Sequence, residues 1–299
     1  MLEGIHFLLT YRCPYECAHC FLHCGPSARG RFSLARLQRV FEDIKRMPTV
    51  KTVFFEGGEP FLEYGLILDG LRMAKEQGLW SGIVTNAFWA SSRSEAVHRL
   101  RPLAALGLDG LSVSLDGYHG HSERSRNALA AAESLGISCG TIQIDPLTVS
   151  PPTTEQGEPV VGGGVMLRGR AAQRLAEGLP RHPSAAFDAC RRERLADPRR
   201  VHVDGSGNVQ VCQGVTIGNC FEVPFPELMS RYDPGADPIC GPLLEGGPAR
   251  LAEVFGIVDP DGYVDECHCC YSVRRRLVDD LPRSLAPRQA YGLGERVPA

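Results

Sequence analysis

"IHFLLTYRCPYECAHCFLHC", residues 5–24, joins a short apolar run to four closely spaced cysteines. The apolar run, 5–10, has the length and composition of a buried β-strand. Cys13, Cys17 and Cys20 follow it in a C-x3-C-x2-C pattern, and Cys24 comes four residues later. Thiols at this density indicate disulfide bonds, a zinc site or an iron–sulfur cluster.

The overall composition bears on which of these three uses applies. The chain has 299 residues, 12 cysteines and a formal net charge of -3, so we expect no general attraction to nucleic acid or to a membrane. The first ten residues carry an acidic residue where a secretory leader needs positive charge, and their apolar run is too short to span a bilayer. We therefore expect a cytoplasmic protein. Disulfides are rare in that compartment, which leaves metal binding or catalysis for the cysteines.

Strand-like and helix-like segments alternate through the first half of the chain. The expected strands are 5–10, 50–55, 82–85, 110–115 and 137–144. The expected helices are 34–46, 64–77, 95–106 and 125–135, three of them followed by a glycine at 78, 107 or 136, where helix C-caps occur. A sixth strand at 165–167 and a short helix at 170–177 follow a Pro- and Gly-rich loop. This alternation predicts an α/β fold, a partial (β/α)6 TIM-like barrel.

The second half of the chain lacks this alternation. Seven of the 12 cysteines lie beyond residue 180, among short segments rich in turn residues. We therefore expect two domains, a partial barrel over residues 1–180 and a smaller cysteine-rich domain over residues 181–299.

A second motif, Gly57-Gly58-Glu59-Pro60, ends the expected second strand, "TVFFEGGEP". The carboxyl ends of parallel strands meet on one face of a βα barrel, so this motif and the first three cysteines should open on the same face. Glycines let backbone groups approach a ligand closely. Three thiolates can hold three irons of a 4Fe–4S cluster and leave the fourth free for a substrate, whereas a structural zinc site or a closed cluster needs four ligands, for which Cys24 is available.

C-x3-C-x2-C followed by GGEP one βα unit later resembles the radical S-adenosylmethionine (radical SAM) superfamily, over roughly residues 5–177. The resemblance implies that Cys13, Cys17 and Cys20 hold a 4Fe–4S cluster whose open iron binds the methionine end of S-adenosylmethionine. It implies that the GGEP strand end, Gly57 to Pro60, contacts the cofactor's amino group. An electron from the cluster would then split the cofactor and give a 5′-deoxyadenosyl radical that removes hydrogen from the substrate.

Further residues fit the same family pattern. "VTNA" places Asn86 at the end of the third strand, and "SVSLDG" places Ser114 and Asp116 where the family contacts the cofactor ribose. "LRGRA", 167–171, is similar to a segment that some members carry near the adenine. His19 stands where the family often has an aromatic residue, and its imidazole can still stack on the adenine.

Two residues near the fourth strand are weaker candidates. His119 lies just beyond that strand and is a candidate proton donor or substrate contact, although a surface histidine bound to nearby backbone is the alternative. Arg126, on the following helix, is a candidate partner for the cofactor carboxylate, the alternative being an ordinary solvated arginine. We expect Cys24 to be a neighbouring thiol and not a ligand.

The cysteines after residue 180 predict a second metal site. "VHVDGSGNVQVC" indicates a hairpin between Cys190 and Cys212, and "ECHCCYSVRRRL" adds Cys267 and Cys270. This order resembles the SPASM and twitch auxiliary-cluster domains of many radical enzymes. We expect one auxiliary 4Fe–4S cluster on these four cysteines. Cys269 in place of Cys270, a second cluster using Cys220 and Cys240, and a zinc site that includes His268 stay open.

The resemblance implies an enzyme that makes a radical from S-adenosylmethionine and modifies a peptide or a small molecule, with the auxiliary cluster favouring a net oxidation. An external one-electron donor of the flavodoxin or ferredoxin type would supply the electron. The competing class is a non-catalytic iron–sulfur electron carrier or a zinc-binding module. It predicts four-ligand closure of both sites and no use for GGEP.

Overall fold

The computed structural model describes residues 1–120, 122–150 and 160–294. Its central feature is an eight-stranded sheet in the order β10-β9-β8-β1-β2-β3-β4-β5. Strands β8 and β1 to β5 are parallel to their neighbours, and β9 and β10 continue the sheet antiparallel beyond β8. The strands are β1 Gly4–Thr10, β2 Thr52–Gly57, β3 Trp80–Thr85, β4 Gly110–Ser114, β5 Ser138–Ile142, β8 Arg200–Asp204, β9 Asn208–Cys212 and β10 Val215–Asn219.

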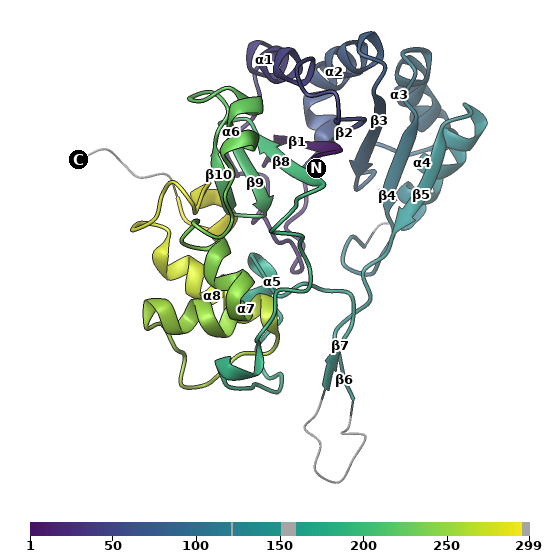
Figure 1. Ribbon diagram of the computed structural model, residues 1–299. Coiled ribbons are helices and arrows are strands. Elements are labelled where there is room, and N and C mark those ends of the chain that lie inside the picture. The colour runs from purple at the N-terminus through teal and green to yellow at the C-terminus, as the bar shows by residue number, and fades with distance from the viewer. Residues whose placement is uncertain (121, 151–159, 295–299) are drawn as a thin grey trace.

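Four helices cover the outer side of the parallel strands (Figure 1). They are α1 Leu34–Ile44, α2 Tyr64–Glu76, α3 Arg93–Ala105 and α4 Ser122–Ser134, and a short 3-10 turn, η1 Pro60–Glu63, precedes α2. Apolar residues at helical spacing in α1, such as Leu37, Val40 and Phe41, pack against Phe7 and other core residues of the strands. The predicted helix ends are confirmed, because Gly78 and Gly107 adopt positive φ angles of 65° and 83° just after α2 and α3.

Side chains alternate between the two faces of each strand. In β1, Ile5, Phe7 and Leu9 are fully buried, while His6 lies on the opposite face. We call the face opposite α1–α4 the inner face of the sheet. It is partly open, since Trp80 is 40% exposed.

The predicted α/β fold with a mostly parallel sheet is confirmed, but the expected strand at 165–167 is wrong. After β5 the chain leaves the sheet and forms an antiparallel hairpin, β6 Thr148–Ser150 with β7 Val160–Gly162, which projects away from the body (Figure 1). Val165 and Leu167 then pack in a separate small apolar cluster with Val264. The sixth parallel strand is β8, which pairs with β1.

The C-terminal region adds helices beside the sheet. These are α5 Arg170–Arg174, α6 Phe225–Arg231, α7 Cys240–Phe255 and α8 Glu266–Leu277, with 3-10 turns η2 Ser184–Ala186 and η3 Arg288–Tyr291. Helix α7 is interrupted at Gly246 and Gly247, whose backbone angles are not helical. Because β8–β10 join the N-terminal sheet, the two parts of the chain share one sheet, and the predicted boundary at residue 180 stays a prediction.

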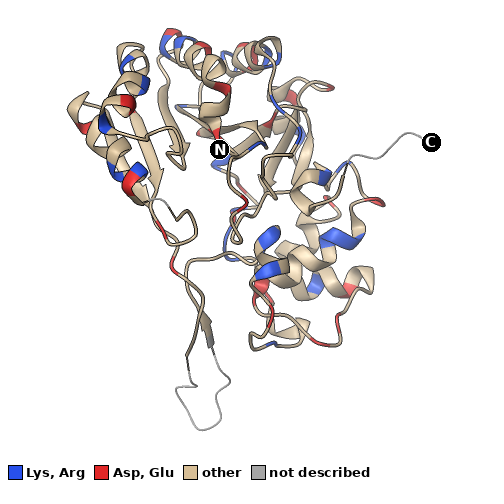
Figure 2. Cartoon of the chain, turned by 180° about the vertical axis from the view of Figure 1, so that it is seen from behind, with Lys and Arg blue, Asp and Glu red and all other residues tan. Residues whose placement is uncertain are grey.

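Charged residues of both signs are interspersed over the outer helices (Figure 2). None of the described helices is both long enough and apolar enough to cross a membrane.

Candidate active site

The first three cysteines lie in the loop that leaves β1. Cys13 is buried, Cys17 and Cys20 are half-buried, and all three carry free thiols. The loop is closed at its base, where the Cys13 amide donates to the Gly25 carbonyl at 3.0 Å. A tighter turn inside it is held by the Cys20 amide, which donates to the Cys17 carbonyl at 3.1 Å. Three thiols are thus presented on a folded loop at the carboxyl end of the sheet.

Protonation of these thiols is set by burial and by Cys24. Burial raises the pKa of Cys13 to about 12 and that of Cys17 to about 11. The pKa of Cys20 falls to about 6, because the Cys24 thiol donates a hydrogen bond to it. Binding a metal cluster here must therefore release protons from Cys13 and Cys17.

The two glycines of GGEP pack closely against the backbone that precedes Cys13. A Cβ on Gly57 would lie 2.3 Å from the Thr10 carbonyl oxygen, and one on Gly58 would lie 2.2 Å from that of Arg12. The Gly58 amide donates to the Thr10 carbonyl at 2.7 Å. The glycines thus let the end of β2 pack directly on the backbone that leads into Cys13. Contact of GGEP with a cofactor stays a prediction.

Glu59 connects the end of β2 to the end of β3. Its carboxylate is fully buried and accepts from the Phe61 amide at 3.0 Å, the Thr85 hydroxyl at 2.8 Å and the Asn86 amide at 2.9 Å. Burial raises the pKa of Glu59 to about 7, against these donors, which lower it. Pro60, the last residue of GGEP, is buried at the start of η1. Glu59 therefore fixes the backbone of the VTNA segment.

Asn86 lies against the first cysteine of the loop. Its side-chain amide donates to the Cys13 sulfur at 3.3 Å, and its Oδ1 accepts from the Phe88 amide at 3.0 Å. Hydrogen bonds to a ligand sulfur orient the ligand and tune the potential of an iron–sulfur cluster. The resemblance also implies that Asn86 binds the cofactor, which stays a prediction; Asn86 lies beside the predicted cluster ligand Cys13.

The end of β4 meets the cysteine loop through a group of aromatic and charged side chains. Asp116 accepts from the Tyr118 and His119 amides and from the His119 ring, the last at 2.9 Å. The His19 ring lies 4.6 Å from that of Tyr118 and 5.0 Å from that of His119, measured between centroids. Burial lowers the pKa of His19 to about 4, so this ring is neutral at pH 7.

One oxygen of this group lacks a partner. Among the described residues, buried Asp116 Oδ2 has none, so it can accept a hydrogen bond from a ligand hydroxyl. Ser114, also buried, accepts at its carbonyl from the Ser125 hydroxyl at 2.7 Å, which anchors α4. The residues predicted to contact a ribose therefore include an unused acceptor.

Helix α4 presents Arg124, not Arg126, to the neighbouring loops. Arg126 is exposed, and its predicted role at the cofactor carboxylate stays a prediction. Arg124 is half-buried, donates to the Phe88 carbonyl at 2.6 Å and lowers the pKa of Tyr15 in the cysteine loop, against a larger effect of burial. Both arginines have the same sequence signal, and only the helix orientation separates them.

Arg170 lies far from the cysteine loop in the sequence but hydrogen-bonds to the backbone of that loop. Its backbone amide donates to the Cys20 carbonyl at 2.8 Å, and its guanidinium donates to the carbonyls of Cys17 at 3.0 Å and Cys24 at 2.6 Å. A Cβ on Gly169 would lie 2.4 Å from the Phe21 backbone, so this residue must be small. The LRGRA motif was noted in the sequence, but its contact with the loop backbone was missed.

The second set of cysteines is brought together from three segments. Cys267 and Cys270 are three residues apart on α8 and so share one helix face. Cys212 ends β9, and Cys190 lies in the segment before β8. The four thiols are near enough to affect one another, since Cys270 and Cys212 raise the pKa of both Cys190 and Cys267, after the larger effect of burial.

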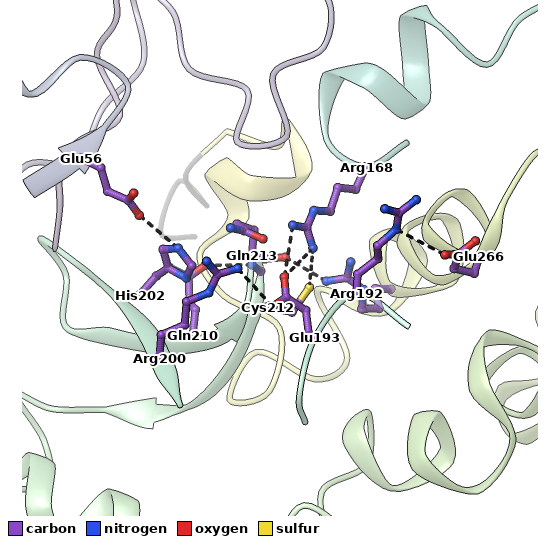
Figure 3. Close-up of polar contacts among 12 residues, drawn as sticks. Glu56, Arg168, Arg192, Glu193, Arg200, His202, Gln210, Cys212, Gln213 and Glu266 are labelled. Atoms are coloured by element: carbon purple, nitrogen blue, oxygen red, sulfur yellow. Dashed lines mark hydrogen bonds and ion pairs between the residues drawn. The ribbon is translucent and has the colours of Figure 1, made fainter. Parts of the chain in front are cut away.

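Arg168 joins this second set to a buried carboxylate. Its guanidinium donates to the Cys212 sulfur at 3.0 Å and pairs with Glu193 at 3.3 Å (Figure 3). It also lies 5.3 Å from the centre of the Phe21 ring in the first cysteine loop. Arg168 and Arg170, two residues apart, thus contact the two cysteine sets.

The other C-terminal candidates have hydrogen-bond partners outside this set of four, although, after the larger effect of burial, Cys270 raises the pKa of Cys269 and Cys212 raises that of Cys240. Cys269 points to the Pro248 carbonyl at 3.9 Å, and His268 accepts the Val264 amide at Nδ1. Burial and nearby Asp204 and Asp43 raise the pKa of Cys220, so that thiol sits in an acidic environment. Cys240 accepts from the Tyr232 hydroxyl at 3.6 Å.

Known proteins similar to this chain point to one family. Residues 7–136, which run from within β1 to just after α4, match the model described as the Radical SAM superfamily. This part of the chain is therefore a radical SAM domain. The match begins in β1, the strand before the three cysteines, and includes GGEP.

Two curated relatives match over part of their length. The chain is 24% identical over 111 residues to "Putative peptide biosynthesis protein YydG" of Bacillus subtilis, a match that covers 37% of this chain and 35% of the relative. It is 27% identical over 116 residues to "Tungsten-containing aldehyde ferredoxin oxidoreductase cofactor-modifying protein" of Pyrococcus furiosus, covering 38% and 31%. The matches span about a third of each relative.

Among solved structures, BtrN in complex with AdoMet and 2-DOIA has a TM-score of 0.50 at 16% identity, over 78% of this chain and 83% of that chain. At this identity the likeness shows a shared fold, which agrees with the partial βα barrel.

Proposed function

We propose that the chain is a radical SAM enzyme whose cluster is held by Cys13, Cys17 and Cys20. The observation that carries the proposal is the three-thiol loop that the ends of β2 and β3 support, through Gly58 and through the Asn86 bond to Cys13. A 4Fe–4S cluster on three thiolates would supply an electron to S-adenosylmethionine at its open iron, which starts the radical chemistry.

The residues around the loop have distinct tasks in this proposal. Asn86 orients the Cys13 sulfur, Arg170 holds the loop backbone and Asp116 Oδ2 accepts a hydroxyl of the cofactor ribose. Glu59 keeps the end of β3 in place under the loop. His119, hydrogen-bonded to Asp116, is positioned to move a proton at this end of the sheet.

We further propose a SPASM- or twitch-like auxiliary site on Cys190, Cys212, Cys267 and Cys270. Two buried arginines support it, because Arg168 donates to Cys212 and Arg274 lies beside Cys270. A cluster on four thiolates is anionic, and buried cations offset such a charge. An auxiliary cluster that accepts an electron from the substrate radical would make the reaction a net oxidation.

The substrate in this proposal is a peptide or a small molecule. The peptide alternative draws on the name of the Bacillus subtilis relative, and the two curated matches cover too little of each relative to separate the alternatives. A flavodoxin or ferredoxin type of donor would supply the electron.

The test is anaerobic incubation of the reconstituted protein with dithionite and S-adenosylmethionine, followed by quantification of 5′-deoxyadenosine. We expect 5′-deoxyadenosine from the wild type and from Cys24→Ala, and none from Cys17→Ala. A fully iron-loaded wild type that releases none would favour the electron carrier. Loss of cluster iron in Cys24→Ala would show that Cys24 is a ligand.

A further inference from the structure

Three polar side chains meet on the inner face of the sheet, and none of them is a cysteine. His6 is on β1, Glu56 on β2 and His202 on β8. His6 pairs in register with His202, and Leu8, two residues later on the same face, pairs with Glu56. Parallel register therefore places all three side chains on one wall of the barrel, at the junction of the N-terminal strands with β8.

Their ligand atoms converge. The His202 Nε2 atom lies 3.1 Å from Glu56 Oε1, and the His6 Nδ1 atom lies 3.3 Å from Glu56 Oε2. Among the described residues, these three form one of two groups whose possible ligand atoms all lie within 4.8 Å of one another. Figure 3 shows Glu56 and His202 turned toward each other across the strands.

Ring packing holds His6 in place, without a hydrogen bond at its Nδ1 atom from the described residues. The His6 ring stacks on Phe54 with centroids 4.6 Å apart and meets the His202 ring edge-on at 5.1 Å. Yet buried His6 Nδ1 makes no well-aligned hydrogen bond within the described structure. Packing thus fixes the ring while its lone pair stays available.

These three side chains are nearly but not fully enclosed. Their exposed fractions are 13% for His6, 16% for Glu56 and 8% for His202. A small ion can therefore reach them from the inner face, while the surrounding strands keep the ligands from spreading apart.

We propose that His6, Glu56 and His202 bind a divalent transition-metal ion of the zinc class. Two imidazoles and one carboxylate form a donor set that suits Zn²⁺ and Fe²⁺. Three protein ligands leave at least one position of a tetrahedral ion for water or for a substrate oxygen. The site shares no ligand with the proposed clusters, so it stands whether or not the radical chemistry is correct.

The test uses zinc and keeps the thiols occupied. The protein is purified anaerobically with its iron–sulfur clusters reconstituted, given one equivalent of Zn²⁺ and desalted. Zinc per chain is then measured, and X-ray absorption at the zinc edge identifies the ligands. Nitrogen and oxygen ligands lie at about 2.0–2.2 Å, whereas thiolate sulfur lies at about 2.3 Å.

We expect one zinc per chain with only nitrogen and oxygen ligands. His202→Ala and Glu56→Gln should each bind zinc at least ~100-fold more weakly, since each removes a direct ligand, while removal of an outer partner alone costs about 10- to 100-fold. His98→Ala, at an exposed histidine of α3, is the matched control and should bind as the wild type does.

Iron content shows whether each variant has folded, because the clusters form only in the folded protein. Glu56→Gln also keeps the shape of the side chain. Zinc bound through sulfur, or wild-type zinc no higher than that of the two variants, would overturn the proposal. The second result would leave the group as a set of polar contacts between Glu56 and the two histidines.

Discussion

Substitution of Gly58 by alanine tests how the end of β2 supports the cysteine loop. A Cβ at this position would lie 2.2 Å from the Arg12 carbonyl oxygen, one residue before Cys13. The two groups must separate by about 1.2 Å to reach ordinary contact at 3.4 Å. That movement also strains the bonds from the Gly58 amide to Thr10 and from the Glu59 amide to Arg12.

The cost follows from these contacts. Overpacking a filled site costs about 1–3 kcal/mol, and each strained backbone hydrogen bond is worth about 0.5–1.5 kcal/mol. We therefore expect Gly58→Ala to lose about 2–6 kcal/mol of stability, a large share of the ~5–15 kcal/mol that a typical protein has. The displaced Arg12 backbone should also reduce iron at Cys13.

The assay is the urea unfolding midpoint together with iron per chain, both measured anaerobically. Gly65→Ala is the matched control, because Gly65 is exposed at the start of α2 and nothing lies within 4 Å of its added Cβ. A helical Gly→Ala change of this kind should raise stability by about 0.5–1 kcal/mol. Wild-type stability and iron content in Gly58→Ala would refute the role assigned to this glycine.

Three further changes address the two cysteine sets. Asn86→Leu removes the donor to Cys13 and should lower the reduction potential of the first cluster by up to a few tens of mV in an EPR-monitored titration; an unchanged potential would contradict the bond. A lysine at position 170 cannot donate to both the Cys17 and Cys24 carbonyls. Arg170→Lys should therefore lose iron from the first cluster to a chelator faster than Arg174→Lys, the control at an exposed position. Equal rates would exclude a role of Arg170 in holding the loop. Cys270→Ala should lower iron by about four atoms per chain while Cys269→Ala leaves it unchanged, and the reverse result would exchange the two assignments.

Local periodicity was enough to predict the strands β1 to β5 and the helices α1 to α4, because each buries its own apolar face on its sequence neighbours. The sixth strand was misplaced for a physical reason. Val165 and Leu167 are apolar but pack against Val264, and the free edge of β1 pairs instead with β8, 196 residues further along the chain, as from Gly4 to Arg200. Such distant pairing leaves no local signal.

The candidate site, like the fold, was predictable from the sequence only where the signal is local. The cysteine motif could be found from spacing alone, but the partners of the loop could not. Asn86 and Arg170 act through contacts that depend on how the strand ends meet. His6 did have a signal, since it is a polar residue at an inward position of the largely apolar strand β1, whereas His202 lies in β8 between Arg200 and Asp204 and does not stand out. Their convergence depends on the pairing of β1 with β8.

The central claim is that three thiolates leave one iron free for S-adenosylmethionine. Electron–nuclear double resonance of the reduced protein tests it directly, with S-adenosylmethionine labelled with ¹⁵N in its amino group and ¹⁷O in its carboxylate. We expect hyperfine coupling from both labels and a changed EPR spectrum of the cluster. A spectrum that saturating S-adenosylmethionine leaves unchanged, with no coupling from either label, would contradict the account.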